Sequence, residues 1–264
     1  NDIKHFSGNF VHKTGDIRNL SSLKEYINDI QPELVFHLAA EAFVRKSYQD
    51  PLKTWETNVI GSINLMESLK SLKNICSAVL ITTDKVYKNE EWIYGYREND
   101  RLGGHDPYSA SKAAMEIAVE SYRLSFCGSN AHQKNNLLFA TARAGNVIGG
   151  GDWSEDRIVP DIVKAIQNKD PIILRNPAST RPWQHVIEIL NGYLNLAKKL
   201  SLNKKINGQS FNFGPKNSEI VSVKQILVYI KNYWPTFGWV KTDNKIINET
   251  KVLVLDTSKA KKVL

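Results

Sequence analysis

Cysteine and long apolar runs are both scarce in this chain of 264 residues. The two cysteines, Cys76 and Cys127, lack the spacing of a metal site, and no cluster of histidine and cysteine accompanies them. We therefore expect no bound metal and a reducing, cytoplasmic setting. No apolar run approaches the ~20 residues that a membrane span requires, so we expect no membrane partner. No signal peptide is visible at the start, which lacks Met, and we expect the sequence to be incomplete there.

The net charge of +8 comes from lysines that are scattered along the chain. No basic stripe interleaved with aromatic residues is present, so we expect no nucleic-acid partner. A solvated lysine-rich surface is the simpler interpretation, and attraction for anions such as nucleotides is the alternative. The hydrophobic content of 42% is ordinary for a globular protein, and the length allows one large or two small domains.

Apolar, strand-like runs alternate with amphipathic helical patterns. This rhythm predicts an α/β fold with a doubly wound parallel sheet. The expected strands lie at 34–38, 78–81, 137–143, 172–174, 211–213 and 252–255. A first helix is expected after the N-cap Ser21. Further helices are expected at 52–72, 108–126, 159–166, 186–200 and 223–233, and a last one begins within 256–264. Asn58 falls in a mostly apolar helical segment, so it must be hydrogen-bonded, either as a structural bridge or as a ligand contact.

Two short stretches carry the candidate chemistry, namely 82–85 at the end of an apolar strand and 108–112 at the start of a helix. Ligands of parallel α/β sheets sit at the carboxyl ends of the strands. Tyr108 and Lys112 are four residues apart, which places them on one face of a helix. A fixed ammonium nearby favours the phenolate, so the pair is a candidate for proton transfer. Without further context, a surface tyrosine and a solvated lysine would give the same spacing.

Three loops have readings that the structure can test. The small residues Ala39 and Ala40 follow a strand and permit either close approach of a flat ligand or tight helix packing. The segment 87–106 is rich in Glu, Gly and aromatic residues, and we interpret it as a functional loop rather than core. Gly149, Gly150 and Gly151 lack the Gly-x-Gly-x-x-Gly arrangement of a phosphate loop, so we expect a turn.

Several motifs occur together in one order and carry a family resemblance. These are Asp16-Ile17, His37-Leu38-Ala39-Ala40, Thr57-Asn58-Val59, Thr83-Asp84-Lys85 and Tyr108-x-x-x-Lys112. In this order the chain resembles the extended short-chain dehydrogenase/reductases that modify nucleotide sugars. Residues 94–100, 143–153 and 181–186 are similar to the CDP-glucose 4,6-dehydratase branch of that family. The resemblance runs from about Thr14 to the end of the chain.

The resemblance implies a Rossmann-like domain that binds NAD and a smaller substrate domain. That family opens with a strand and a Gly-rich turn that holds the pyrophosphate of NAD, and this sequence contains neither. We therefore expect a sheet that lacks its first strands, weak NAD binding and an incomplete C-terminal region. The expected division is an NAD-binding domain at 1–148, with 181–214 returning to it, and a substrate domain at 149–180 and 215–264.

The resemblance also implies a reaction, the NAD-dependent conversion of CDP-glucose to CDP-4-keto-6-deoxyglucose, a step of deoxysugar biosynthesis as in lipopolysaccharide O-antigen. Tyr108 would remove the proton of the sugar 4-hydroxyl, and Lys112 would lower the pKa of Tyr108 and bind the nicotinamide ribose. Thr83 would align the sugar O4. Asp84 would protonate the departing 6-hydroxyl. For this role its carboxyl must hold a proton, and burial favours that protonated form. Lys85 stands where many related dehydratases carry Glu, and it would act as the C5 base. The alternative is an electrostatic role, in which its charge stabilises the ketone oxygen or the diphosphate.

The remaining implied contacts are spread along the sequence. Asp16 and Ile17 would border the adenine, and the other cofactor contacts would be Leu38, Ala39, Ala40, Thr57 and Asn58. Substrate contacts would be Asn146, Arg157 and Arg181, because a guanidinium donates to a diphosphate in a fork. For Arg157 a surface salt bridge is the alternative, and His37 and His185 are expected to be structural.

Family members commonly dimerise through two long helices from each subunit, which here would be 57–72 and 109–126. We expect a homodimer or a higher homo-oligomer. The alternatives are a 4,6-dehydratase for another nucleotide sugar, an epimerase, or a non-catalytic protein that binds NAD or a nucleotide sugar. The Asp84-Lys85 pair argues against an epimerase, which needs no acid for a 6-hydroxyl.

Overall fold

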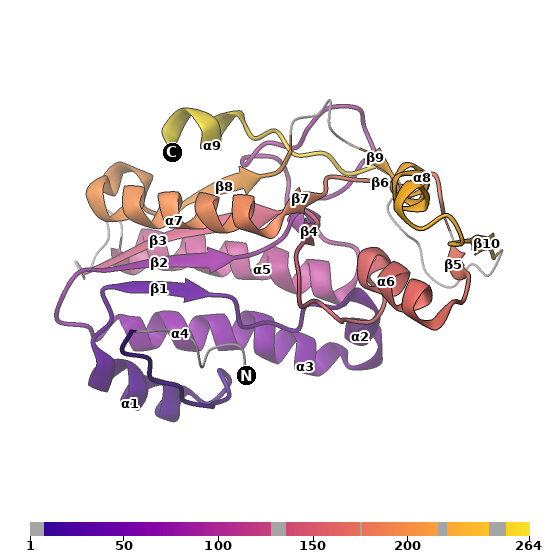
Figure 1. Cartoon of the computed structure of the whole chain (residues 1–264). Helices are drawn as coiled ribbons and strands as arrows, with labels where there is room; N and C mark the ends of the chain where they lie inside the picture. The colour runs from indigo at the N-terminus through magenta and orange to yellow at the C-terminus, as the bar shows by residue number, and fades with distance from the viewer. Residues whose placement is uncertain (1–7, 128–135, 175, 216–220, 243–251) are drawn as a thin grey trace.

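The centre of the molecule is a parallel sheet of four strands. The structure, a computed structural model, describes residues 8–127, 136–174, 176–215, 221–242 and 252–264 (Figure 1). The strands are β1 (Leu34–His37), β2 (Cys76–Ile81), β3 (Leu137–Ala144) and β8 (Gln209–Phe213), in the order β1-β2-β3-β8. Every neighbouring pair is parallel, and Ala78 of β2 pairs with Val35 and Phe139. The predicted parallel α/β sheet is confirmed.

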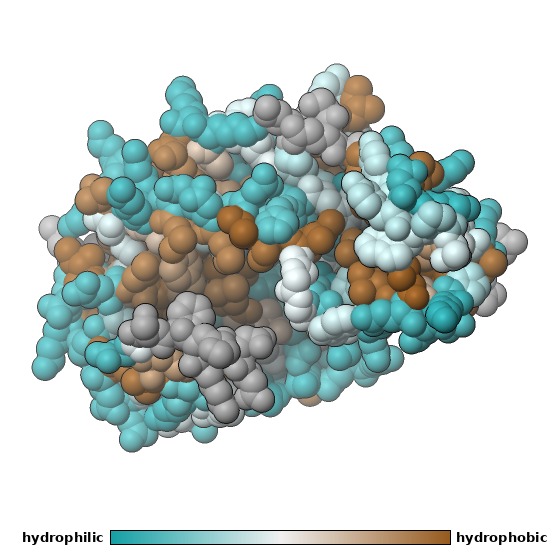
Figure 2. Space-filling model, in the orientation of Figure 1, coloured by the Kyte–Doolittle hydropathy of each residue, from teal (hydrophilic) through white to brown (hydrophobic). Residues whose placement is uncertain are grey.

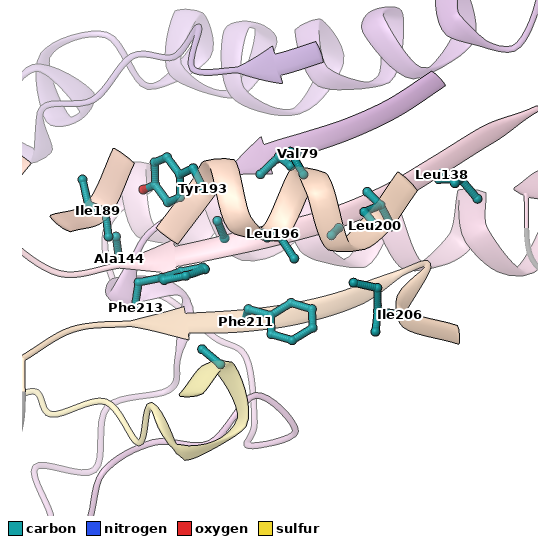
Figure 3. Packing of buried hydrophobic residues seen from close by; sticks show 14 residues of the cluster. Val79, Leu138, Ala144, Ile189, Tyr193, Leu196, Leu200, Ile206, Phe211 and Phe213 are labelled. Carbon is teal, nitrogen blue, oxygen red and sulfur yellow. The ribbon is translucent and has the colours of Figure 1, made fainter. Parts of the chain in front are cut away.

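Helices cover both faces of this sheet and make three layers (Figure 1). On one face, α7 (Val186–Leu202) packs its buried side chains against β2, β3 and β8, as Figure 3 shows for Leu196, Phe211 and Phe213. On the other face lie α1 (Leu20–Ile30), α4 (Gly61–Leu69) and α5 (Pro107–Tyr122). Successive side chains of a strand point to opposite faces, which explains why Val79 belongs to the first core and Ala78 to the second.

The predicted helix at 52–72 is built from three consecutive pieces. These are α3 (Pro51–Trp55), a π-helical turn η2 (Glu56–Ile60) and α4, and the Asp50 side chain caps the first of them. A π-helical turn inside a longer helix often marks a functional site. A second π-helical turn, η4 (Arg123–Cys127), extends α5 to the end that we predicted.

A smaller unit lies beyond the carboxyl ends of the strands (Figure 1). It contains α6 (Ile158–Asn168), β5 (Ile172–Leu174), α8 (Val223–Tyr233) and β10 (Trp239–Lys241), with β5 and β10 parallel. Its own core includes Ile162, Leu174, Leu227 and Phe237. Two short ribbons link it to the sheet, β4 (Val147–Ile148) with β7 (Gln184–His185), and β6 (Thr180–Arg181) with β9 (Val221–Ser222). The Gly149–151 segment after β4 is a turn, as expected.

Residues 87–106 form a loop, as predicted, but part of this loop belongs to the core. Tyr87 and Tyr96 are fully buried, stack with ring centroids 5.0 Å apart, and form a small core with Leu253 and Leu255. Gly95 permits this packing, because a Cβ there would lie 2.7 Å from the backbone nitrogen of Asp256. The composition of this segment, with its glycine and charged residues, did not indicate that some of its aromatic residues are buried.

Three other expectations need correction. Residues 252–255 do not form a named strand, although Leu255 makes one isolated bridge to Tyr96. A short helix, α2 (Val44–Gln49), was not predicted, and neither were the turns η3 (Asp84–Val86) and η5 (Lys204–Ile206). The final helix, α9 (Ser258–Val263), contacts β8 and adds Ala260 to the core under α7, although the predicted division assigns it to the substrate domain. Residues 216–220 and 243–251 of that predicted domain lie outside the described part of the chain.

The face drawn in Figure 2 carries apolar side chains near its middle. The exposed large apolar residues of α7 and of β1 with its continuation are Ile187, Leu190, Leu194, Leu202, Leu34 and Leu38. In the described part of the chain, no helix is both long enough and apolar enough to cross a membrane.

Candidate active site

Three strand ends meet at the carboxyl edge of the sheet. Because β1, β2 and β3 are parallel, the segments 38–40, 82–85 and 145–146 follow them at this same edge. The smaller unit faces this edge across the short ribbons (Figure 1). This is where ligands bind in open parallel α/β sheets.

Helix α5 brings Tyr108 to this edge. Asp106 caps the helix through a capping box with Ser109, and Pro107 occupies the first turn. The backbone N–H of Tyr108 donates to the hydroxyl of Ser47, 3.1 Å away, so the first turn is also fixed from α2. The Tyr108 side chain is buried, and the Thr83 hydroxyl hydrogen-bonds its phenol.

The segment after β2 presents an acid and an amine to the same place. Thr83 begins the turn η3, and its hydroxyl accepts from the N–H of Lys85 and donates to the Asp84 carboxylate, 3.0 Å away. Asp84 is almost fully buried, whereas Lys85 is about one-third exposed, with its Nζ 3.7 Å from Asp84 Oδ1. Gly145 lets the strand ends approach closely, because a Cβ there would lie 2.7 Å from Pro182 and 3.4 Å from Asp84 Oδ2.

The electrostatics of Tyr108 differ from the prediction in one respect. Burial raises the pKa of Tyr108, and the cations that oppose this effect are Lys85 and, more weakly, Arg157. Thr83 also lowers the pKa of the phenol through its hydrogen bond, and Asp84 raises it. Lys112, which we expected to be the main cation acting on Tyr108, is not among these groups. Among the charged side chains named here, Lys85 lowers the pKa of the phenol most.

Lys112 lies one turn further along α5 and points into the protein. It is buried, and its Nζ donates to the backbone carbonyl of Ile81, 3.0 Å away, at the last residue of β2. Burial lowers the pKa of Lys112 to about 8, and the carboxylate of Glu116 opposes that shift. Lys112 is therefore a buried cation that ties helix α5 to the end of β2.

The predicted adenine residues lie next to α4. Arg18 holds the exposed Asp16 carboxylate with a bond of 2.7 Å from its Nη2, and these hydrogen bonds lower the pKa of Asp16 to about 2. Ile17 packs against Gly61, where a Cβ would lie 2.6 Å from the isoleucine side chain. Beyond β1, Leu38 and Ala39 are exposed, so this ledge is open to a ligand rather than filled by a helix.

The sequence left two alternatives for Asn58, a structural bridge or a ligand contact. In the structure, its side chain forms a bridge between segments of the chain. Its amide is fully buried and bonds both backbone groups of Glu41, at 2.8 and 3.1 Å, and the Ser111 hydroxyl. Ser111 in turn donates to the carbonyl of Tyr108. The π-helical turn η2 thus ties the segment after β1 to the start of α5, and Thr57 lies half-buried on the same turn.

The three predicted substrate residues come from different segments. Arg157 precedes α6, lies 3.7 Å from Asp152, and stands over the ring of Phe43 at 5.4 Å. Through its effect on Tyr108, it is the substrate candidate that the structure places in the phenol's electrostatic surroundings. Arg181 lies in β6, where its Nη1 donates to the carbonyl of Thr180, and the backbone carbonyl of Asn146 accepts from Gln184.

The largest feature that our sequence analysis missed is a buried ion pair behind Lys112. Both nitrogens of the Arg143 fork, Nε and Nη2, bond the carboxylate of Glu116 at 3.0 Å. The signal was present, because Glu116 follows Lys112 by one helical turn and Arg143 interrupts an apolar strand. An unpaired charge is costly to bury, so opposite charges on two buried elements are expected to form an ion pair.

The two histidines that we expected to be structural bond to the protein. His37 is buried beside the Ser62 hydroxyl, 2.8 Å away, and burial lowers the pKa of His37 to about 3. His185 caps α7 through its Nδ1. Among the described residues, no group of three or more His, Cys, Asp or Glu side chains is placed to hold a metal ion.

Comparison with known proteins assigns the family. The sequence model described as GDP-mannose 4,6 dehydratase matches residues 1–264. The chain belongs to the GDP-mannose 4,6-dehydratase family. In this family member, Tyr108 and Thr83 lie at the carboxyl edge of the parallel sheet.

Relatives within and around the family act on nucleotide sugars by name. This family member is 42% identical to CDP-glucose 4,6-dehydratase of Salmonella typhimurium over 247 residues, which are 93% of this chain and 69% of the relative. It is 26% identical to UDP-glucose 4-epimerase of Mycoplasma pneumoniae, covering 92% of this chain and 74% of that one.

The fold is shared with solved structures of the same kind. A structure of DesIV, a dTDP-glucose 4,6-dehydratase from Streptomyces venezuelae with NAD bound, superposes with a TM-score of 0.75 at 21% identity, covering 94% of this chain and 71% of that one. At this identity the likeness concerns the fold.

Proposed function

We propose that the protein is a CDP-glucose 4,6-dehydratase, a hydro-lyase that converts CDP-glucose to CDP-4-keto-6-deoxyglucose with NAD as cofactor. The observation that carries this proposal is the cluster of a buried phenol, a buried carboxyl and a partly exposed amine at the carboxyl edge of the sheet. The relative that is 42% identical supports the choice of CDP-glucose among nucleotide sugars.

The residues at the sheet edge fit part of a dinucleotide, because the sequence lacks the Gly-rich turn that would hold the pyrophosphate. Leu38 and Ala39 form an open ledge beyond β1, the Asp16 carboxylate is ionised and exposed, and Lys112 bonds the end of β2. We assign Asp16 and Ile17 to the adenine side, residues 38–40 to the ledge, and Lys112 to the nicotinamide ribose. Thr57 and Asn58 support this ledge indirectly, since Asn58 holds the backbone of Glu41, the residue after Ala40. When bound, NAD accepts a hydride from C4 of the sugar and returns it to C6.

Tyr108 and Thr83 act at the 4-hydroxyl in this proposal. Tyr108 takes the hydroxyl proton when C4 is oxidised, and Thr83 holds the sugar O4 in line with the phenol. Burial alone works against the phenolate, so the ammonium of Lys85 is needed to favour it. The cation that stabilises the phenolate thus comes from the strand end that also supplies the acid.

Asp84 and Lys85 act at C5 and C6. After C4 is oxidised, the Lys85 ammonium gives its proton to the Asp84 carboxylate. The neutral amine then removes the C5 proton, which the ketone has made acidic. A double bond forms between C5 and C6 as the C6–O bond breaks, and Asp84 gives its proton to the departing hydroxyl, which leaves as water. When hydride returns to C6, the Lys85 ammonium gives the proton back to C5. The proton that Tyr108 took from the 4-hydroxyl then restores the Lys85 ammonium, which faces Asp84 at 3.7 Å in the free protein.

We place the diphosphate and sugar between the sheet edge and the smaller unit. Arg157 is the leading candidate to bind them, because it lies close enough to Tyr108 to affect the phenol. Arg181 and Asn146 would contribute from the ribbons that join the two units. The proposed division into domains at 1–148 with 181–214, and at 149–180 with 215–264, follows the same boundary, except that α9 packs on the sheet.

We also propose that the protein forms a homodimer through the helices 57–72 and 109–126. Apolar side chains on this side of the molecule are exposed in the single chain, among them Ile60 on η2, with Ile117 and Leu124 on α5 and η4. η2 and α5 pack on each other, so one partner surface could cover both.

A direct assay tests the proposed activity. The purified protein is incubated with NAD and CDP-glucose, and the 4-keto sugar is detected by the absorbance that it develops in alkali. We expect product with CDP-glucose and at least tenfold less with UDP-, GDP- or dTDP-glucose. Product from another nucleotide sugar alone would reject the substrate assignment, and a 4-epimer without loss of water would reject the dehydratase.

A further inference from the structure

Glu116 is a buried carboxylate with a complete set of partners. Its Oε1 accepts from the Thr82 hydroxyl at 2.6 Å, and its Oε2 accepts from Thr141 at 2.7 Å and Ser210 at 3.0 Å. The Arg143 fork completes the set, and it also donates to Tyr87 and to the carbonyl of Glu98. The Glu116 carboxylate thereby joins helix α5 to the end of β2, to β3 and to β8. Its partner Arg143 extends the connection to the 87–106 segment.

The bond from Thr82 is the one that reaches the candidate site. Thr82 stands between Ile81, whose carbonyl accepts from Lys112, and Thr83, whose hydroxyl bonds the Tyr108 phenol. Glu116 and Lys112 are one turn apart on α5. Two side chains of α5 therefore fasten the helix to the last residue of β2 and to the residue after it. Both lie directly before the residues that meet the substrate in our proposal.

The charges around Lys112 leave Glu116 as the anion that supports it. On β1, His37 lies near enough to Lys112 for the ammonium to disfavour its protonation. On β3, Arg143 is bound to Glu116, and on η3, Asp84 is paired with Lys85. Tyr108 lies one turn before Lys112 on α5. Burial alone would raise the pKa of Glu116, but Arg143 and the hydroxyls of Thr82 and Thr141 hold that pKa below its ordinary value. Glu116 is thus a permanent negative charge.

We propose that Glu116 is a positioning residue that, through Thr82, sets the distance between helix α5 and the tip of β2 and keeps Lys112 protonated. The catalytic part of this inference rests on the proposed function, whereas the protonation of Lys112 does not. Glu116 itself touches no reacting atom in this scheme.

The protonation arm uses NMR of the protein with ¹³C-labelled lysine. The Lys112 side-chain signal is assigned by its loss in Lys112→Arg and followed between pH 6 and 11. We expect Glu116→Gln to weaken proton binding at Lys112 at least tenfold. Thr141→Val, which removes a hydroxyl from the same carboxylate, should leave it within twofold. Because Glu116→Gln leaves Arg143 buried without its partner, the double variant Glu116→Gln/Arg143→Met is measured beside it. A smaller weakening in the same direction is expected, because the positive charge of Arg143 is removed as well. An unchanged Lys112 titration in the folded variants would overturn the proposal.

The positioning arm compares two matched hydroxyls. Thr82→Val and Thr141→Val each remove one bond to Glu116 from a buried threonine. We expect Thr82→Val to lower kcat at least tenfold with little change in KM, Thr82→Ser to restore it, and Thr141→Val to stay within twofold. Equal losses of kcat in the two valine variants would show that the network serves stability alone. If no nucleotide sugar is turned over, the NMR arm still decides the protonation of Lys112.

Discussion

At the scale of single residues, the candidate site depends on which cation faces the phenol. The Tyr-x-x-x-Lys spacing placed Lys112 beside Tyr108, but Lys112 bonds the end of β2, and Lys85 is the cation that most lowers the pKa of the phenol. Spacing along a helix gives the face of a side chain and not its partner. The partner was decided by the neighbouring strand end, which no local pattern describes.

Lys85→Met separates the two roles that we give to this lysine. Oxidation at C4 should be slower at neutral pH, because the phenol loses its nearest cation, and should recover as pH rises. Elimination should be absent at every pH. A rise in absorbance at 340 nm on mixing with CDP-glucose reports oxidation, and mass spectrometry of the sugar reports loss of water. Lys88→Met, at an exposed lysine paired with Glu90, is the control. Equal loss of oxidation and elimination at all pH values would refute the base assignment.

His37 should make the stability of the fold depend on pH. Its pKa is lowered to about 3 by burial, so the unfolded chain binds more protons than the native one below about pH 6.5. Stability from this residue is complete above that pH and falls as pH decreases, by up to about 1.4 kcal/mol per pH unit. Urea denaturation at pH 7, 6 and 5 should show a shallower decline for His37→Gln than for the exposed control His12→Gln. Parallel declines in both variants would contradict this account.

At the scale of elements, the sequence reading was most successful where periodicity is strong. The four sheet strands and α5, α7 and α8 lie where apolar spacing predicted them. It missed the buried part of 87–106, where Tyr87 and Tyr96 pack in one small core with Leu253 and Leu255. Packing between segments some 160 positions apart is invisible to a local pattern.

The capping box of α5 should matter to activity as well as to stability. Asp106→Ala removes the acceptor of the Ser109 N–H, at a cost of about 1 kcal/mol, two residues before Tyr108. We expect kcat to fall several-fold, with thermal unfolding at a lower temperature. Asn203→Ala removes the cap of η5 and should leave kcat unchanged. If both variants lose activity alike, the cap has no specific link to Tyr108.

At the scale of the whole molecule, the proposed dimer makes a simple prediction. Ile117 is 60% exposed in the single chain, and it lies on the helix that we expect to meet a partner. Ile117→Glu should convert a dimer to a monomer in sedimentation velocity, because a carboxylate would be buried without a partner. Leu202→Glu, at an exposed position on α7, should leave the mass unchanged. A wild-type protein that sediments as a monomer would contradict the dimer.

The most direct test of the whole account follows one atom through the reaction. The protein is incubated with NAD and with CDP-glucose that carries deuterium at C4, and the product is examined by NMR and mass spectrometry. The account predicts a 4-keto-6-deoxy sugar that retains the deuterium at C6, because hydride leaves C4 and returns to C6 within one closed site. A product without deuterium, or a sugar that keeps it at C4, would contradict the proposed chemistry.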